Sequence, residues 1–117
     1  MIKGACHCGA VSFEVAVPPQ RIVSCNCSIC RRYAALWVHA PPNEGVTLHA
    51  PEGSTRTYSW GDNELLFHAC KVCNCITHWS GRKGPRFAVN FRLVDPADRE
   101  GLPLRHFDGA DSWTFLD

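Results

Sequence analysis

The sequence predicts an all-β protein: a single domain, built as a complex β-sandwich or partly open barrel of short strands that zinc cross-links. Three observations support this prediction. Short segments of alternating apolar and polar residues recur at intervals of about ten residues. Gly, Pro, Asn and Asp separate these segments, as is typical of turns. Eight cysteines, gathered in three tight clusters, offer the ligands for the cross-links.

The first expected strand covers residues 11–17, and the prolines that follow end it because proline cannot donate to a β-ladder. Its alternation predicts one buried face, made of Val11, Phe13, Val15 and Val17. A second strand, residues 35–40, stops at Pro41 and Pro42. Further strands are expected at residues 46–50, 55–60, 65–69, 76–80, 86–94 and 104–108.

Only two short helices are expected. One begins in the middle cysteine cluster and covers residues 28–35. The other covers residues 95–100, with Asp95 as its N-cap and Pro96 at its first helical position. The chain therefore has too little helix for an α/β layer arrangement, and one β domain over residues 1–117 is the simplest prediction.

Length and charge exclude several classes of function. A formal net charge of +1 lacks the basic surplus of a nucleic-acid-binding protein. The longest apolar run, YAALWVHA, is far shorter than the roughly 20 residues that a membrane helix needs. The opening MIKGACHCGAVSF is not a signal peptide, so we expect a cytoplasmic protein with reduced thiols. In that compartment, closely spaced cysteines favour metal binding over disulfides.

The first and last cysteine clusters predict a closed structural zinc site. Cys6 and Cys8 form a C-x-C pair followed by a glycine, and Cys70 and Cys73 form a C-x-x-C pair. Such pairs lie on tight turns whose amide N–H groups point at the sulfurs. Two pairs far apart in the sequence complete a tetrahedral four-thiolate site and hold distant parts of the sheet together.

The middle cluster predicts a second zinc with a different role. Cys25, Cys27 and Cys30 supply three thiolates from one short segment and leave the fourth position open, which is typical of a catalytic site. An open position can hold a substrate thiol as its thiolate, so sulfur nucleophile chemistry is favoured over hydrolysis. The alternative is a closed site completed by Cys75, His68 or His78.

The motifs GACHCGAVSFEV, SCNCSICRR and CKVCNCITHW together resemble the glutathione-dependent formaldehyde-activating enzyme family, whose domain also occurs in centromere protein V. The resemblance covers about Lys3 to Arg92. It implies a complex all-β fold with two zinc sites, in which Cys6, Cys8, Cys70 and Cys73 form the structural site. It also implies that the site made by Cys25, Cys27 and Cys30 condenses glutathione with formaldehyde, in a reaction of the carbon–sulfur lyase type.

Two arginines and one departure from the family pattern complete the site prediction. Arg31 and Arg32 follow the open cluster and are candidate donors to the carboxylates of glutathione, because arginine binds carboxylate in a bidentate fork. Asn74 takes the place of a glycine that the family often has, and asparagine tolerates the left-handed conformation. Cys75 adds an eighth sulfur.

We therefore expect a zinc enzyme that acts on the adduct of a small aldehyde with glutathione or another small-molecule thiol. A different class of function is a zinc-stabilised protein-binding module without catalysis, in which Cys75 closes the second site. A labile three-cysteine site that buffers metal or senses oxidants is a third hypothesis.

Overall fold

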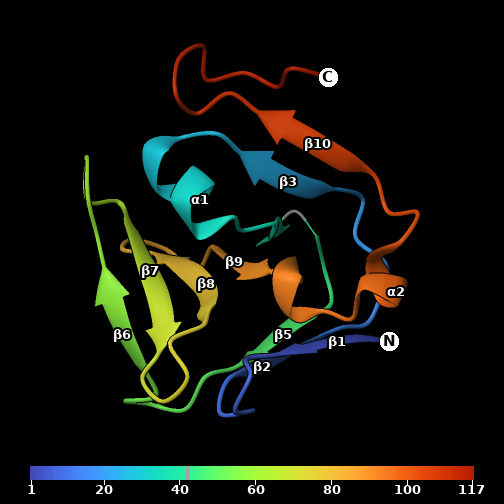
Figure 1. The fold of residues 1–117 in the computed structure, drawn as a ribbon, viewed down its shortest axis with the longest axis vertical. Helices are drawn as coiled ribbons and strands as arrows, with labels where there is room; N and C mark the ends of the chain where they lie inside the picture. The colour runs from blue at the N-terminus through green and yellow to red at the C-terminus, as the bar shows by residue number, and fades with distance from the viewer. Residues whose placement is uncertain (42) are drawn as a thin grey trace.

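The computed structural model describes residues 1–41 and 43–117, so the strand break expected at Pro42 lies outside the described residues. Its strands form two sheets that do not close into a barrel, which confirms the all-β prediction (Figure 1). The smaller sheet has the order β1-β2-β5, and the larger has the order β10-β3-β4-β9-β8-β7-β6. The strands are β1 (Ile2–Ala5), β2 (Ser12–Val15), β3 (Ile22–Cys25), β4 (Trp37–Ala40), β5 (Val46–His49), β6 (Thr55–Tyr58), β7 (Leu65–Cys70), β8 (Ile76–Gly81), β9 (Phe87–Asn90) and β10 (Leu104–Phe107).

Both sheets are antiparallel except where β10 pairs parallel to β3. This pair brings the end of the chain beside β3 and the segment that follows it, as Figure 1 shows. The alternation of apolar residues does not predict β1 or β3. Val17 is a correction to the expected buried face: β2 ends at Val15, and Val17 is 61% exposed.

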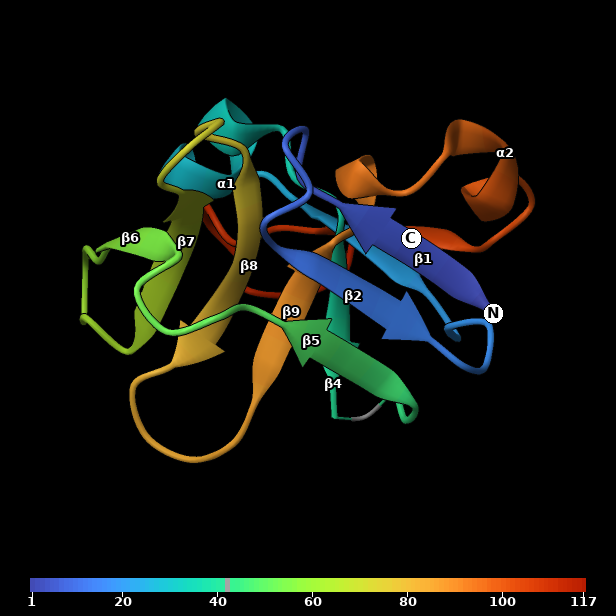
Figure 2. The same ribbon diagram turned by 90° about the horizontal axis from the view of Figure 1, so that it is seen from below.

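The centre of the larger sheet, at β4 and β9, is buried on both faces. On one face, Val38 of β4 and Val89 of β9 pack with Phe13 and Val15 of the smaller sheet, which crosses the larger one in Figure 2. On the other face, Trp37 and its neighbours form a second apolar cluster. Successive residues of a strand point to opposite faces, so β4 contributes to both clusters. The second face carries the functional site described below.

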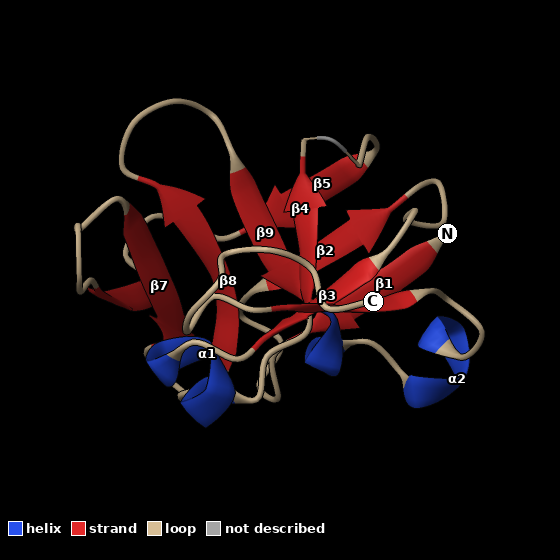
Figure 3. Cartoon of the chain, turned by 90° about the horizontal axis from the view of Figure 1, so that it is seen from above, coloured by secondary structure: helices blue, strands red, loops and turns tan. Residues whose placement is uncertain are grey.

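The helices are short, as predicted, and lie along one side of the strands in Figure 3. They are α1 (Ser28–Tyr33), the 3-10 helix η1 (Phe91–Leu93) and α2 (Pro96–Arg99). The Asp95 carboxylate accepts a hydrogen bond from the Ala97 amide, which confirms it as the N-cap of α2. None of the helices in the described part of the chain has the length and apolar character that crossing a membrane requires.

Candidate functional site: two cysteine clusters and a cavity

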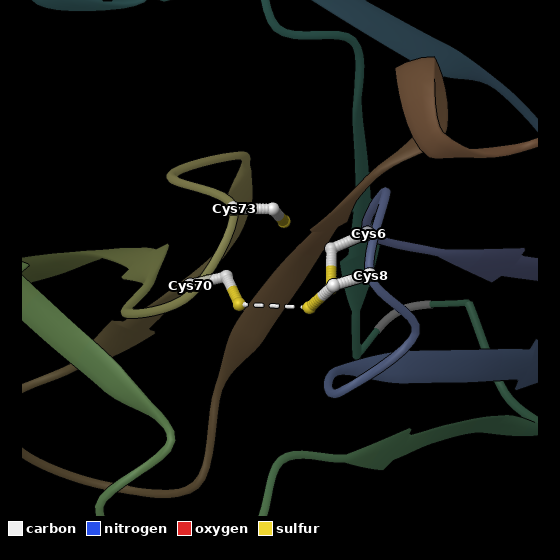
Figure 4. Close-up of side chains that lie close together, drawn as sticks. All are labelled: Cys6, Cys8, Cys70 and Cys73. Carbon is white, nitrogen blue, oxygen red and sulfur yellow. Dashed lines mark hydrogen bonds between the residues drawn. The ribbon is translucent and has the colours of Figure 1, made fainter.

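The first cysteine cluster joins the two sheets. Cys6 and Cys8 lie in the turn between β1 and β2, while Cys70 ends β7 and Cys73 lies in the turn that follows it (Figure 4). The sulfurs of Cys6 and Cys8 are 3.7 Å apart, and those of Cys8 and Cys70 are 3.6 Å apart. Four sulfurs at about 2.3 Å from a zinc ion would be separated by about 3.8 Å, so this cluster has the dimensions of a tetrahedral metal site.

Backbone amides point at these sulfurs, as expected for metal-binding turns. The Val11 N–H donates to the Cys6 sulfur at 3.4 Å. The Cys75 N–H donates to the sulfur of Cys73 and lowers the pKa of that thiol to about 5, which favours the thiolate that a metal needs. Asn74 has a φ of 65°, which confirms the expectation that asparagine adopts the left-handed conformation in this turn.

Cys75, the eighth sulfur, lies beside the first cluster. It packs with Cys6, Val11 and Cys70. His68 exchanges hydrogen bonds with Thr55 and Ser80 and stacks on His78, with ring centroids 3.9 Å apart. In the part of the chain that the structure describes, no carboxylate, histidine or further cysteine lies with Cys25, Cys27 and Cys30 in one group of possible metal ligands.

The second cluster is built around the start of α1. Cys27 is the N-cap of this helix, and its sulfur accepts a hydrogen bond from the Cys30 amide at 3.4 Å. The indole N–H of Trp37 donates to the sulfur of Cys30, also at 3.4 Å. A hydrogen bond from Cys30 lowers the pKa of Cys25 to about 6, so one thiolate is present at neutral pH before any metal binds. The three sulfurs lie within 4.8 Å of one another.

The segment after β10 covers this second cluster. The side chain of Asn26 donates to the carboxylate of Asp108 at 3.0 Å and accepts from the Ala110 amide at 3.0 Å. These bonds hold Gly109 against the cluster so closely that a Cβ built there would lie 2.6 Å from the sulfur of Cys25. Only glycine, which has no side chain, fits at this position. The spacing of the cysteines gives no sign of Gly109, whose FDGADS context is that of an ordinary turn.

A cavity of about 570 Å³ opens beside the second cluster, and all three of its cysteines line it. This volume is typical of pockets that bind small organic molecules. The walls are mainly apolar and include seven Trp and Phe residues, while Asp62 and Glu64 add two carboxylates. Arg21 and Arg86 line it too, with their guanidinium groups over the rings of Phe115 and Trp79 at 4.5 and 5.6 Å. His39 also lines the cavity, and burial lowers its pKa to about 4, so its imidazole is neutral at pH 7.

Arg31 and Arg32 are not brought to this cavity. Both are exposed on α1, and Arg32 donates to the Ser28 carbonyl within the helix at 2.8 Å. The arginines that the fold does place in the lining, Arg21 and Arg86, come from the start of β3 and from the segment before β9. The sequence indicates only which arginines are close to the cysteines along the chain, whereas closeness in space depends on the pairing of strands.

Two packed β-sheets carry a four-cysteine cluster and a three-cysteine cluster, each of which could hold a metal ion, and this defines a class of small cysteine-rich β proteins. The family model described as "glutathione-dependent formaldehyde-activating enzyme" matches residues 1–106. The chain therefore belongs to this family.

Individual proteins are similar to the chain as well. A Halomonas elongata protein, named as a candidate glutathione-dependent formaldehyde-activating enzyme, is 51% identical over 35 residues. The match covers 29% of this chain and 22% of that protein, so the chain spans about a fifth of its curated relative. A crystal structure of a Rhodobacter sphaeroides protein superposes with a TM-score of 0.66 at 28% identity, over 87% of this chain and 98% of the other.

Proposed function

We propose that the protein is a zinc-dependent enzyme of the carbon–sulfur lyase type that forms and cleaves the adduct of glutathione with formaldehyde, in the cytoplasm. The observation that carries the proposal is the position of Cys25, Cys27 and Cys30 on the wall of a cavity large enough for a small-molecule thiol. The family supports glutathione and formaldehyde as substrates. All eight cysteines are free thiols, which fits a reducing compartment.

The residues of both clusters fit zinc. Thiolate is a preferred zinc ligand, and the first cluster has the sulfur separations of a tetrahedral site. Cys6, Cys8, Cys70 and Cys73 would hold a structural ion. Cys25, Cys27 and Cys30 would hold a second ion, whose remaining coordination position keeps a substrate thiol deprotonated at neutral pH.

The protein's own residues would bind and orient the substrates. Arg21 and Arg86 offer guanidinium groups to the carboxylates of glutathione. The Trp37 indole fixes the Cys30 sulfur, and the aromatic walls limit the access of water to the reacting atoms. The neutral imidazole of His39 can form a hydrogen bond with a bound substrate. The absence of a fourth sulfur near the second cluster, among the described residues, favours this enzyme over a module with two closed zinc sites.

Two-dimensional exchange NMR tests the proposal. Glutathione, formaldehyde and their adduct exchange spontaneously, so the zinc-loaded protein is compared with a sample that contains no protein. We expect faster exchange with the protein, and a return to the spontaneous rate for Cys30→Ser. Cys75→Ser is the matched control, because Cys75 belongs to neither ligand group. Equal rates with and without the zinc-loaded protein would refute the proposed reaction.

A further inference from the structure

Every tryptophan of the chain lines the cavity beside the second cysteine cluster. The chain has four tryptophans, and they come from β4, from the segment after β6, from β8 and from the segment after β10. They are Trp37, Trp60, Trp79 and Trp113. Four segments far apart in the sequence thus bring their largest apolar side chains to one place. Such a lining favours the burial of an apolar ligand surface.

The aromatic lining extends from the bottom of the cavity to its mouth. Trp37 and Trp79 are 2% and 5% exposed, so they form the bottom. Trp60 and Trp113 are 48% and 70% exposed and lie at the rim. Large exposed aromatic side chains at the edge of a cavity are typical of a surface that a ligand covers. The aromatic lining therefore extends over a greater length than a one-carbon substituent could fill.

Aromatic rings also surround the place where the chemistry would occur. Trp37 contacts the sulfur of Cys30, and the ring of Phe67 lies 6.2 Å from that of Trp37. Phe107 and Phe115 line the cavity with the cysteines and pack edge to face, with centroids 5.1 Å apart. Formaldehyde gives an adduct whose reacting carbon carries only hydrogens and a hydroxyl group. The one-carbon group of that adduct is too small to cover this apolar wall by itself.

We propose that this enzyme accepts, besides formaldehyde, aldehydes with an aromatic or comparably bulky apolar side group, and that the tryptophan-lined cavity holds that group. The inference rests on the proposed function and extends only the range of aldehydes. In the reaction, the thiol sulfur attacks the carbonyl carbon and a carbon–sulfur bond forms. The electron pair of the carbonyl π-bond moves to oxygen, which takes up the proton that the thiol releases. No oxidant or reductant is needed.

Two stable thioethers of glutathione test this inference by binding alone. S-benzylglutathione represents the adduct of an aromatic aldehyde, and S-methylglutathione represents that of formaldehyde. Isothermal titration of the zinc-loaded protein should show that the benzyl compound binds at least about tenfold more tightly, the ratio expected for burying a phenyl group. Tryptophan emission should change with the benzyl compound, because all four indoles lie in the cavity.

Equal affinity for the two thioethers would overturn the inference and leave the proposed function standing. Failure of both to bind would overturn it as well, and the exchange measurement with formaldehyde would then report separately on the proposed reaction.

A pair of variants links the preference to the cavity. Trp60→Ala removes a rim side chain and should lower the benzyl-to-methyl affinity ratio several-fold. Tyr58→Ala is the matched control, because Tyr58 is similarly exposed, at 53%, lies two residues earlier and does not line the cavity. An unchanged ratio in Trp60→Ala would overturn the assignment of the side group to this rim.

Discussion

The substitution Gly109→Ala tests how the end of the chain positions the second cysteine cluster. Its methyl group would lie 2.6 Å from the sulfur of Cys25 and 3.3 Å from the Cβ of Cys27. The first distance is about 0.8 Å short of the 3.4 Å at which ordinary contact begins. Gly109 does not have a positive φ, so alanine adds no backbone strain there. The perturbation is therefore a direct displacement of one proposed metal ligand.

The expected effect is a loss of metal affinity at this cluster alone. Forcing a methyl group into a packed site costs about 1–3 kcal/mol, which corresponds to about 5- to 150-fold in a binding constant. Competition between the protein and a chromophoric chelator, with Zn²⁺ as the probe, measures this loss. We expect two zinc-binding steps, of which the weaker belongs to the three-cysteine cluster. The affinity of that step should fall, while the affinity of the four-cysteine cluster stays unchanged.

Gly9→Ala provides the matched control at the other cluster. A Cβ at Gly9 meets nothing within 4 Å, but its φ of 83° lies in the left-handed region, where alanine costs about 1–2 kcal/mol. This variant should weaken zinc binding by the four-cysteine cluster and leave the three-cysteine cluster unchanged. If Gly109→Ala kept the second binding constant within about twofold of the parent, the contact between the end of the chain and Cys25 could not be what positions that sulfur.

Two further predictions concern stability. Cys70→Ser removes a fully buried ligand of the first cluster and should lower the melting temperature of the zinc-loaded protein by at least about 10 °C, whereas Cys75→Ser should change it little, as calorimetry can show. Burial lowers the pKa of His78 to about 3, so only the unfolded chain gains that proton as the pH falls from 6.5 toward 3. Stability should therefore fall by up to about 1.4 kcal/mol per pH unit, and urea titrations of His78→Gln should show a shallower slope; an equal slope would contradict the assignment.

Much of the fold could be predicted because its elements are local. Alternation over a few residues identified β2 and most strands from β4 onward, and the capping residue Asp95 identified α2. The strand β1 escaped because its buried position, Gly4, carries no apolar side chain. The strand β3 escaped because its pattern is not alternating: Ile22 and Val23 are both buried, one on each face of the larger sheet. A strand buried on both faces has no polar side for periodicity to detect.

The composition of the cysteine clusters was equally predictable, whereas the surroundings of the second cluster were not. The ligands of that cluster lie within six residues, but Gly109 reaches it through the parallel pairing of β10 with β3. Arg21 and Arg86 reach the cavity through strand order in the same way. Pairing between distant strands cannot be recognised in any short stretch of sequence. The sequence therefore indicates Arg31 and Arg32, which are close to the cysteines along the chain, as the anion donors.

The two clusters differ in what they hold together, and this difference explains their different ligand counts. Cys6 lies in a turn of the smaller sheet and Cys70 ends a strand of the larger one, so a metal there would join the sheets and benefit from a fourth protein ligand. The second cluster needs no metal to hold the C-terminal segment in place, because the hydrogen bonds of Asn26 already attach the segment around Asp108. Its fold is thus held without a fourth protein ligand, so a metal held by these three cysteines would have room for a substrate thiol from the cavity. Substitution of the first cluster should therefore lower mainly the stability, and substitution of the second cluster should lower mainly the activity.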